Sequence, residues 1–318
     1  MYKVSEILLL VKVLLINIFK LKSIKSQKYT LVTACDESHF IYLEQLISNF
    51  KKVTHFDNFI IYDLGLNESQ MKYLKSIKFI DFRKFSFDSY PPHFQKRLPD
   101  HGNKIGGFAW KPAILKVIKE EFSDNIVWFD SANLFNQRFI FFKVLLLSRG
   151  FISFYSSGTV EDYTHKKVIA NLELTNKKDI LLSKNLMGGL VGFNTKNKDA
   201  IKIIDEWYEL CLDESNIFPE GSSLNDHRHD QSILSLCYWK YLRKKLPSML
   251  SLYGVSIQNW PNKILFLFDD RDGIREKLLK NFSMHSTTTD FRCELIFLFN
   301  IENLDKIPLK LLITKKVQ

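Results

Sequence analysis

Residues 125–133 read NIVWFDSAN, in which an apolar run stops at a carboxylate, Asp130. So short a run, rich in β-branched and aromatic side chains, is typical of a strand buried on both faces. Two earlier stretches share this design, YTLVTAC at 29–35 and NFIIYD at 58–63, and both end in or beside an acid. Because strands buried on both faces occur mainly in parallel sheets, the three stretches predict a parallel sheet.

Amphipathic segments separate these strands. The spacing of apolar residues predicts helices over 41–50, 68–76 and 111–121, and extended structure over 79–87. Pro112 falls in the first turn of the third helix, where a missing N–H is tolerated. Strands that alternate with helices predict an α/β domain whose mostly parallel central sheet is flanked by helices.

The alternation begins after Lys28, and no repeat or linker interrupts it. We therefore expect one domain over residues 29–292, followed by an apolar and basic tail over 293–318. Composition agrees with a globular protein, since 46% of the 318 residues are hydrophobic and 25% are charged. The four cysteines show no C-x-x-C spacing and indicate free thiols in a reducing compartment.

Residues 1–28 form an apolar and basic N-terminal segment. Its apolar run, 7–19, contains Lys12 and as a helix would span about 20 Å, short of a hydrocarbon core of about 30 Å. Four lysines follow within 20–28. We expect this segment to lie on an anionic membrane surface, so that the protein is cytoplasmic and peripheral on the inner face. A helix packed on the domain and a signal anchor are the alternatives.

The net charge of +10 invites a nucleic-acid partner, but its composition argues against one. Only nine of the 45 basic residues are Arg, the side chain that best binds phosphate and base edges with two hydrogen bonds. We therefore expect no nucleic-acid partner, and interpret the excess of Lys mainly as a bias of composition.

Strand ends are where an open parallel sheet binds its ligands. Asp130 emerges at such an end, and a carboxylate there can hold Mg²⁺ or Mn²⁺ against a diphosphate. Upstream, the sequence GGFAWKP at 106–112 precedes a helix. It offers Trp110 as a stacking plane and Lys111 as a point charge suited to phosphate. A helix cap and an ordinary loop are the plainer interpretations of these two stretches.

Two further clusters lie later in the chain. Gly188 and Gly189 precede a predicted strand, which suits a backbone lying against a sugar or a phosphate, although a plain turn also fits. Asp230 stands before a predicted helix at 231–241, either as its N-cap or, with His229 and Gln231, as a group at a site. No nucleophile elbow, Walker loop or G-x-G-x-x-G motif is present.

Taken in order, six stretches resemble the GT-A fold of nucleotide-diphospho-sugar glycosyltransferases, including bacterial polysaccharide-synthesis transferases. They are YTLVTACDESHF, FIIYDLGL, GGFAWKPAIL, IVWFDSAN, LMGGLVGF and HRHDQSIL, and they span about residues 29–240. The family's metal-binding motif, usually Asp-x-Asp, matches at Asp130, but Ala132 stands where the second Asp would be. The resemblance implies a GT-A fold and a manganese or magnesium ion held by Asp130 and by a late histidine, His285.

The resemblance also assigns roles to the other candidates. Ala34 and Asp36 would contact the nucleoside, and Lys111 would neutralise the diphosphate. Gly188 and Gly189 would line the donor sugar, and Asp230 would be the catalytic group. The remaining candidates for substrate binding are Asn133, His229 and Gln231.

The expected activity is therefore transfer of a sugar from a nucleotide-diphosphate sugar to a hydroxyl of a glycan or lipid-linked acceptor, with stereochemistry left open. Two alternatives of other classes remain. One is a non-catalytic scaffold of the same fold at a membrane in polysaccharide assembly, which the missing second Asp favours. The other is a metal-dependent phosphoesterase built on Asp226, His227, His229 and Asp230.

Overall fold

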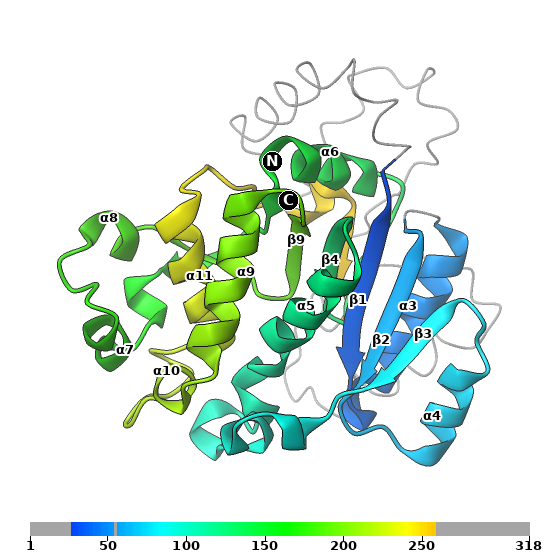
Figure 1. Cartoon of the computed structure of the whole chain (residues 1–318), viewed down its shortest axis with the longest axis horizontal. Coiled ribbons are helices and arrows are strands. Elements are labelled where there is room, and N and C mark those ends of the chain that lie inside the picture. Colours follow the sequence, from blue (N-terminus) through cyan, green and yellow to red (C-terminus); the bar gives the residue numbers. More distant parts are fainter. Residues whose placement is uncertain (1–26, 54–55, 259–318) are drawn as a thin grey trace, which may run out of the picture.

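The computed structural model of the chain describes residues 27–53 and 56–258 (Figure 1). The predicted membrane-surface segment, the C-terminal tail and His285 lie outside these residues, as does the end of the predicted domain. Among the described residues, no helix is both long and apolar enough to cross a membrane.

A six-stranded sheet in the order β3-β2-β1-β4-β9-β6 forms the centre of the molecule. The first four strands of that order are parallel, whereas β9 runs antiparallel to both β4 and β6. The strands are β1 (Tyr29–Cys35), β2 (Asn58–Asp63), β3 (Ile80–Lys84), β4 (Asn125–Phe129), β6 (Phe151–Ile152) and β9 (Leu190–Asn194). The prediction of an α/β protein with a mostly parallel sheet flanked by helices is confirmed.

Helices cover both faces of this sheet (Figure 1). On one face lie α3 (Phe40–Lys52) and α6 (Phe139–Arg149), and on the other α5 (Trp110–Glu121) and α9 (Lys198–Cys211). The opposite placement of α3 and α5 follows from right-handed crossovers, because β1 leads to β2 in one direction along the sheet and β3 leads back to β4 in the other. The helix α11 (Asp230–Tyr241) packs against the outer side of α9.

Smaller elements surround this centre. Two antiparallel pairs, β5 with β10 and β7 with β8, lie beside the main sheet. The remaining bounds are α4 (Glu68–Lys75), β5 (Asn133–Phe135), β7 (Tyr155–Thr159), α7 (Lys166–Asn171), α8 (Lys178–Leu181), β8 (Lys184–Leu186), α10 (Glu214–Ile217) and β10 (Val255–Ile257). Short 3-10 turns occupy much of residues 87–108, between β3 and α5.

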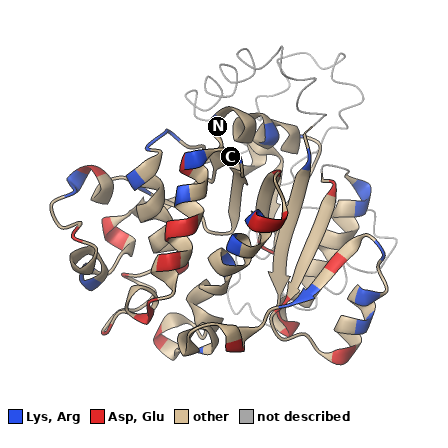
Figure 2. Ribbon diagram, viewed as in Figure 1, with Lys and Arg blue, Asp and Glu red and all other residues tan. Residues whose placement is uncertain are grey.

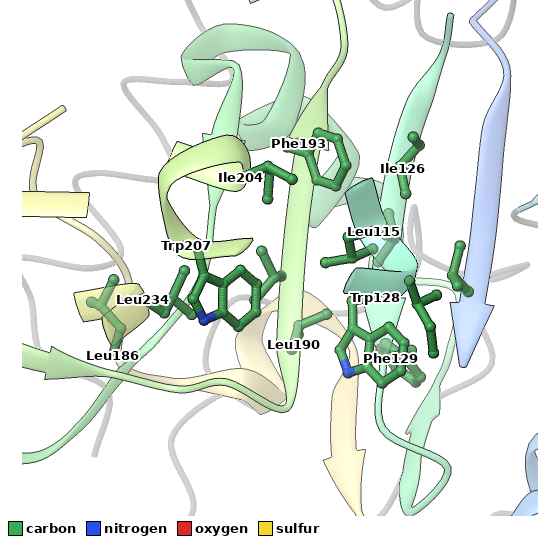
Figure 3. Packing of buried hydrophobic residues seen from close by; sticks show 14 of the residues in the cluster. Leu115, Ile126, Trp128, Phe129, Leu186, Leu190, Phe193, Ile204, Trp207 and Leu234 are labelled. Carbon is green, nitrogen blue, oxygen red and sulfur yellow. The ribbon is translucent and has the colours of Figure 1, made fainter. Parts of the chain in front are cut away.

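The core covers both faces of the sheet, and Figure 3 shows the part of it around α9 and the strands β4 and β9. Trp128 of β4 and Trp207 of α9 are fully buried there, with Leu190 of β9 close by. Burying side chains of this size contributes about 1.5–3 kcal/mol each. Charged residues gather instead on the outer helices and at strand ends, while the central strands are almost free of them (Figure 2). The core therefore fixes where the polar strand ends lie.

Candidate active site at the carboxyl end of the sheet

The carboxyl ends of β1, β2 and β4 meet at one edge of the sheet, because these three strands are parallel. The order of strands reverses between β1 and β4, since the chain runs from β1 outward to β3 and then returns to the other side of β1. At such a reversal the loops diverge to opposite faces and leave a crevice, which is where open α/β sheets bind their ligands. Asp130 follows β4 directly at this point.

The side chain of Asp130 is held by neighbours but stays 42% exposed. Its Oδ1 accepts a hydrogen bond of 2.7 Å from the indole Nε1 of Trp128. The two side chains meet because residues two apart on a strand share a face. The same Oδ1 lies 3.3 Å from Nζ of Lys111, so one carboxylate oxygen is committed to the protein.

Lys111 lies at the second position of α5 and is 4% exposed. Its Nζ donates a 3.0 Å hydrogen bond to the carbonyl oxygen of Gly188 and lies 3.8 Å from Oδ2 of Asp230. Burial lowers its pKa, but the charges of Asp130 and Asp230 outweigh burial, so the pKa of Lys111 ends above its usual value. The ammonium therefore stays charged between two carboxylates.

Asp230 is the buried member of this group, with its side chain 3% exposed. Burial, its largest influence, and the charge of Asp130 raise the pKa of Asp230 to about 7, although Lys111 pulls the other way. Its Oδ2 accepts no hydrogen bond from the described residues. A carboxyl group with this pKa can take up or release a proton near neutral pH.

The backbone around Asp230 differs from the prediction. His229, not Asp230, is the N-cap of α11, and Asp230 is its first helical residue. Of the two alternatives for Asp230, the helix N-cap is wrong, because His229 has φ 52° and ψ −128° and turns the chain sharply into the helix. The indole Nε1 of Trp207 donates to the carbonyl oxygen of Asp230 at 2.8 Å and fixes its position from the core.

The turn at Gly188 and Gly189 joins these groups. The carbonyl oxygen of Gly189 accepts hydrogen bonds from the backbone N–H of Asp130 at 2.9 Å and from Nδ2 of Asn133 at 2.8 Å. A Cβ on Gly189 would lie 2.7 Å from Oδ2 of Asp130, so glycine is required for this close approach. Gln231 borders the same turn, with its Cβ 3.5 Å from where a Cβ of Gly188 would lie.

His229 belongs to a buried cluster of imidazoles. Its Nε2 lies 2.8 Å from Nδ1 of His101, and its ring borders Gly107. Burial, with neighbouring positive groups, lowers the pKa of His229 to about 3 and that of His227 to about 4. Both are therefore neutral, and His227 uses its two nitrogens on the backbone of His165 and Asn216. The cluster anchors the segment that carries Asp230.

The end of β1 forms a second part of this edge. Ala34 is buried in the strand, while Asp36 lies just beyond it and accepts hydrogen bonds from Ser38 and His39. Burial raises the pKa of Asp36, but these bonds outweigh burial and bring it to about 2. The guanidinium of Arg97, 49% exposed, lies 3.9 Å from Oδ2 of Asp36. A cationic group thus stands at the same edge as Lys111.

The structure therefore brings together Lys111, Asp130 and Asp230 with Gly188, Gly189, Asn133 and Gln231. It places His229 in the imidazole cluster, and Ala34 and Asp36 at the neighbouring strand end. Trp110, expected as a stacking plane, is instead 5% exposed, because its ring packs on Phe108 and Trp128.

Two residues of this edge escaped the sequence analysis. The apolar run places Trp128 in the core, although its position two residues before Asp130 puts both side chains on one face of the strand. Arg97 lies within a polar loop, and no spacing in the sequence relates it to Asp36.

A divalent cation is implied by the resemblance, and the described donors do not fit one. Oδ1 of Asp130 is occupied by Trp128 and Lys111, and the space between Asp130 and Asp230 is filled by the ammonium. Nowhere among residues 27–53 and 56–258 do three or more His, Cys, Asp or Glu side chains gather in a way that could hold a metal. The same finding covers the set proposed for a phosphoesterase, Asp226, His227, His229 and Asp230.

Comparison with known proteins adds a family of unknown function and a set of glycosyltransferase structures. The sequence model of the family described as protein of unknown function DUF1647 matches residues 4–115. No curated protein matches the chain significantly.

Solved structures that resemble the chain do so at low identity. The bifunctional glycosyltransferase WbbM is 10% identical, with 70% of this chain and 39% of that chain covered and a TM-score of 0.45. The galactosyltransferase LgtC, bound to donor and acceptor sugar analogues, is 15% identical, with 82% and 98% covered and a TM-score of 0.43. Mouse xyloside xylosyltransferase 1 is 12% identical, with 84% and 94% covered and a TM-score of 0.42. The chain thus spans about two fifths of WbbM and nearly all of the other two.

Proposed function

We propose that this protein is a glycosyltransferase, which moves a sugar from a nucleotide-diphosphate sugar to a hydroxyl of a glycan or lipid-linked acceptor. The observation that carries the proposal is the group of Lys111, Asp130 and Asp230 at the switch point between β1 and β4. A buried lysine between two carboxylates, one of them exposed and the other with a pKa near 7, is a costly arrangement that structural stability alone does not favour.

In this proposal, Asp130 faces the donor sugar with its free oxygen, beside the backbone of Gly189. Asp230 accepts the proton of the acceptor hydroxyl, because its pKa of about 7 allows proton uptake at neutral pH. Lys111 holds the two carboxylates in place. We place the acceptor hydroxyl beside Gly188, where a Cβ would lie 3.6 Å from Oδ2 of Asp230, in ordinary van der Waals contact with that oxygen.

Transfer also leaves a nucleoside diphosphate whose negative charge must be stabilised. The side chain of Lys111 is 4% exposed and its Nζ is engaged with Gly188 and the two carboxylates, whereas the guanidinium of Arg97 is exposed at the same edge. We therefore propose that Arg97 binds the diphosphate, beside a nucleoside that lies against Ala34 and Asp36. Arginine suits this role because its planar group donates two parallel hydrogen bonds to a phosphate.

The test is hydrolysis and binding of nucleotide sugars by the full chain. We would titrate UDP-, GDP- and CDP-sugars by calorimetry and measure released nucleoside diphosphate. Wild type is expected to bind one nucleotide class, and Arg97→Gln to weaken its binding about tenfold or more, a loss of roughly 1.4 kcal/mol. The matched control is Arg83→Gln. It makes the same change at an arginine that pairs with Asp81 and Glu121 and with none of the proposed site residues.

Two outcomes would count against the proposal. If no nucleotide sugar binds wild type under any condition, the catalytic assignment falls and a non-catalytic scaffold becomes the better interpretation. If binding occurs but Arg97→Gln and Arg83→Gln weaken it equally, the diphosphate does not lie against Arg97.

A further inference from the structure

The ammonium of Lys111 fills a space bounded on three sides by oxygen atoms. These atoms are the carbonyl oxygen of Gly188 at 3.0 Å, Oδ1 of Asp130 at 3.3 Å and Oδ2 of Asp230 at 3.8 Å. Nζ donates a hydrogen bond to the carbonyl oxygen, whereas Oδ2 of Asp230 interacts with it through charge and accepts no hydrogen bond. Two carboxylates and a carbonyl converging on one point form the kind of oxygen set that hard cations use.

Aromatic faces complete the space. Nζ of Lys111 lies 5.2 Å from the ring centre of Phe108 and 5.5 Å from that of Trp128. The negative face of an aromatic ring attracts an ammonium, and the attraction is strongest when water is excluded, as it is here. A divalent ion keeps its water molecules more tightly and gains less from such walls. The surroundings therefore favour the side chain that occupies them.

The position of Lys111 on its helix supports the same conclusion. A cation at the start of a helix is disfavoured by the helix dipole, and burial disfavours it further. The charges of Asp130 and Asp230 outweigh the effect of burial on its pKa. Lys111 is therefore stabilised by the two carboxylates and not by its position at the start of α5.

We infer that the ammonium of Lys111 stands between Asp130 and Asp230 where a divalent cation would otherwise bind, and that it prevents the free protein from holding such an ion. The inference goes beyond sugar transfer, since it concerns the affinity of the protein for a metal alone. It follows from repulsion, because a second cation between the same carboxylates would lie within a few ångströms of a buried positive charge. It also accounts for the missing second Asp, since Ala132 stands where that further ligand is expected.

Removing the ammonium of Lys111 tests the inference. Without the ammonium, two carboxylates face each other with no charge between them, and such a pair either shares a proton or binds a cation. Lys111→Ala should therefore create a Mn²⁺ site. Lys111→Gln should do the same, because the carboxamide oxygen can itself be a ligand. Lys111→Arg, which keeps the charge, should not.

The experiment uses Mn²⁺ alone with the full chain at about pH 8, above the pKa of Asp230, and follows free Mn²⁺ by electron paramagnetic resonance. Wild type is expected to leave the signal of free Mn²⁺ nearly unchanged, while Lys111→Ala binds about one equivalent at least about tenfold more tightly. Adding Asp230→Asn to Lys111→Ala should abolish the gain. The matched control is Lys116→Ala, which removes the same charge from the same helix at the pair with Asp205.

Two results would overturn the inference. One is tight binding of Mn²⁺ by wild type that is lost in Asp130→Asn, which decides the question even if no Lys111 variant folds. The other is a gain in Lys111→Ala no larger than that in Lys116→Ala, with circular dichroism showing both variants folded. Neither result depends on nucleotide binding, so failure of the proposed function is seen separately in the calorimetric titrations.

Discussion

Asp63 and Asp130 both follow the apolar residues of a parallel strand at the same edge of the sheet, yet they are built into different kinds of structure. Asp63 is 7% exposed, and its Oδ1 accepts hydrogen bonds from the backbone N–H groups of Gly65 at 2.8 Å and Leu66 at 2.7 Å. Asp130 has its oxygens near Lys111 and Gly189, which are distant in sequence, and it remains partly exposed.

The difference shows what an acid at a strand end can do. The bonds of Asp63 are those of a turn, in which an aspartate bonds the backbone two and three residues on. The contacts of Asp130 join α5, β4 and the turn before β9. A carboxylate that satisfies its own turn stabilises the fold, whereas one that collects distant charged groups and stays accessible can act on a ligand. The predictions that follow separate these two roles.

The largest effect is expected from Asp230→Asn, which removes the proposed proton acceptor and changes the shape little. Turnover of the nucleotide sugar to an acceptor should fall by about 10²–10⁴-fold, because a positioned acid or base contributes that much. Below a pH of about 7, wild-type turnover should also decrease as Asp230 takes up a proton. The matched control is Asp205→Asn, at an acid of α9 paired with Lys116, and equal loss in both variants would contradict the role of Asp230.

Asp63→Ala should affect folding stability and leave nucleotide binding unchanged. It leaves two backbone N–H groups without their acceptor in a turn that is largely buried, which costs about 2 kcal/mol in free energy of unfolding. Asp130→Ala should lose activity and stability together, because it takes one carboxylate from the buried ammonium of Lys111 and the acceptor from the indole N–H of Trp128. Urea denaturation gives the free energy of unfolding of both variants, and calorimetry gives their nucleotide binding. Loss of binding by a folded Asp63→Ala variant would contradict the purely structural role of Asp63.

The strands of the central sheet that lead to this edge are well predicted from the sequence. The bounds of β1 and β2 agree with the predicted stretches 29–35 and 58–63, because a buried strand is encoded in adjacent residues. By contrast, nothing in the pattern predicts α6, since FIFFKVLLLSR is apolar almost throughout and shows little of the helical period.

The site is only partly predictable for a related reason. Lys111, Asp130 and Asp230 each stand out by type and position, but their meeting depends on how α5 and α11 pack on the sheet. The partners of Asp230 are set by His229, whose positive φ no simple pattern announces. Asp63 and Asp130 look alike in sequence because the residues that distinguish them, Lys111 and Gly189, are far along the chain.

The buried carboxyl of Asp230 should make the protein less stable as the pH rises. Its folded pKa of about 7 exceeds the value of 3.8 for a free side chain, so between these values the unfolded state releases a proton that the folded state keeps. Stability from this group is thus complete below about pH 4 and lost by about pH 7. Relative to wild type, Asp230→Asn should gain about 4 kcal/mol between pH 4 and pH 8.

Asp205→Asn provides the opposite sign in the same denaturation series. Burial raises the pKa of Asp205, but hydrogen bonds from Lys116 and Lys119 outweigh it and lower the pKa overall. Its contribution is therefore present above the unfolded pKa and lost in acid, so this variant should lose stability at pH 8 relative to acid. Shifts of the same sign in both variants would contradict the assignment for Asp230.

The smallest effect concerns the imidazole cluster, which supports Asp230 from the other side. His227 has a pKa of about 4 in the fold against 6.5 when free, so the unfolded state binds more protons between these values. Stability from this group is therefore present above about pH 6.5 and falls as the pH drops towards 4. His227→Gln keeps a donor for the carbonyl oxygen of Asn216 and removes the titration. Between pH 6.5 and about pH 5, the free energy of unfolding of this variant should fall by about 1 kcal/mol less than that of wild type, as measured by thermal denaturation. If His227→Gln loses as much stability in acid as wild type does, protonation of His227 is not what destabilises the fold. The position of Asp230 would then depend chiefly on its hydrogen bond with Trp207.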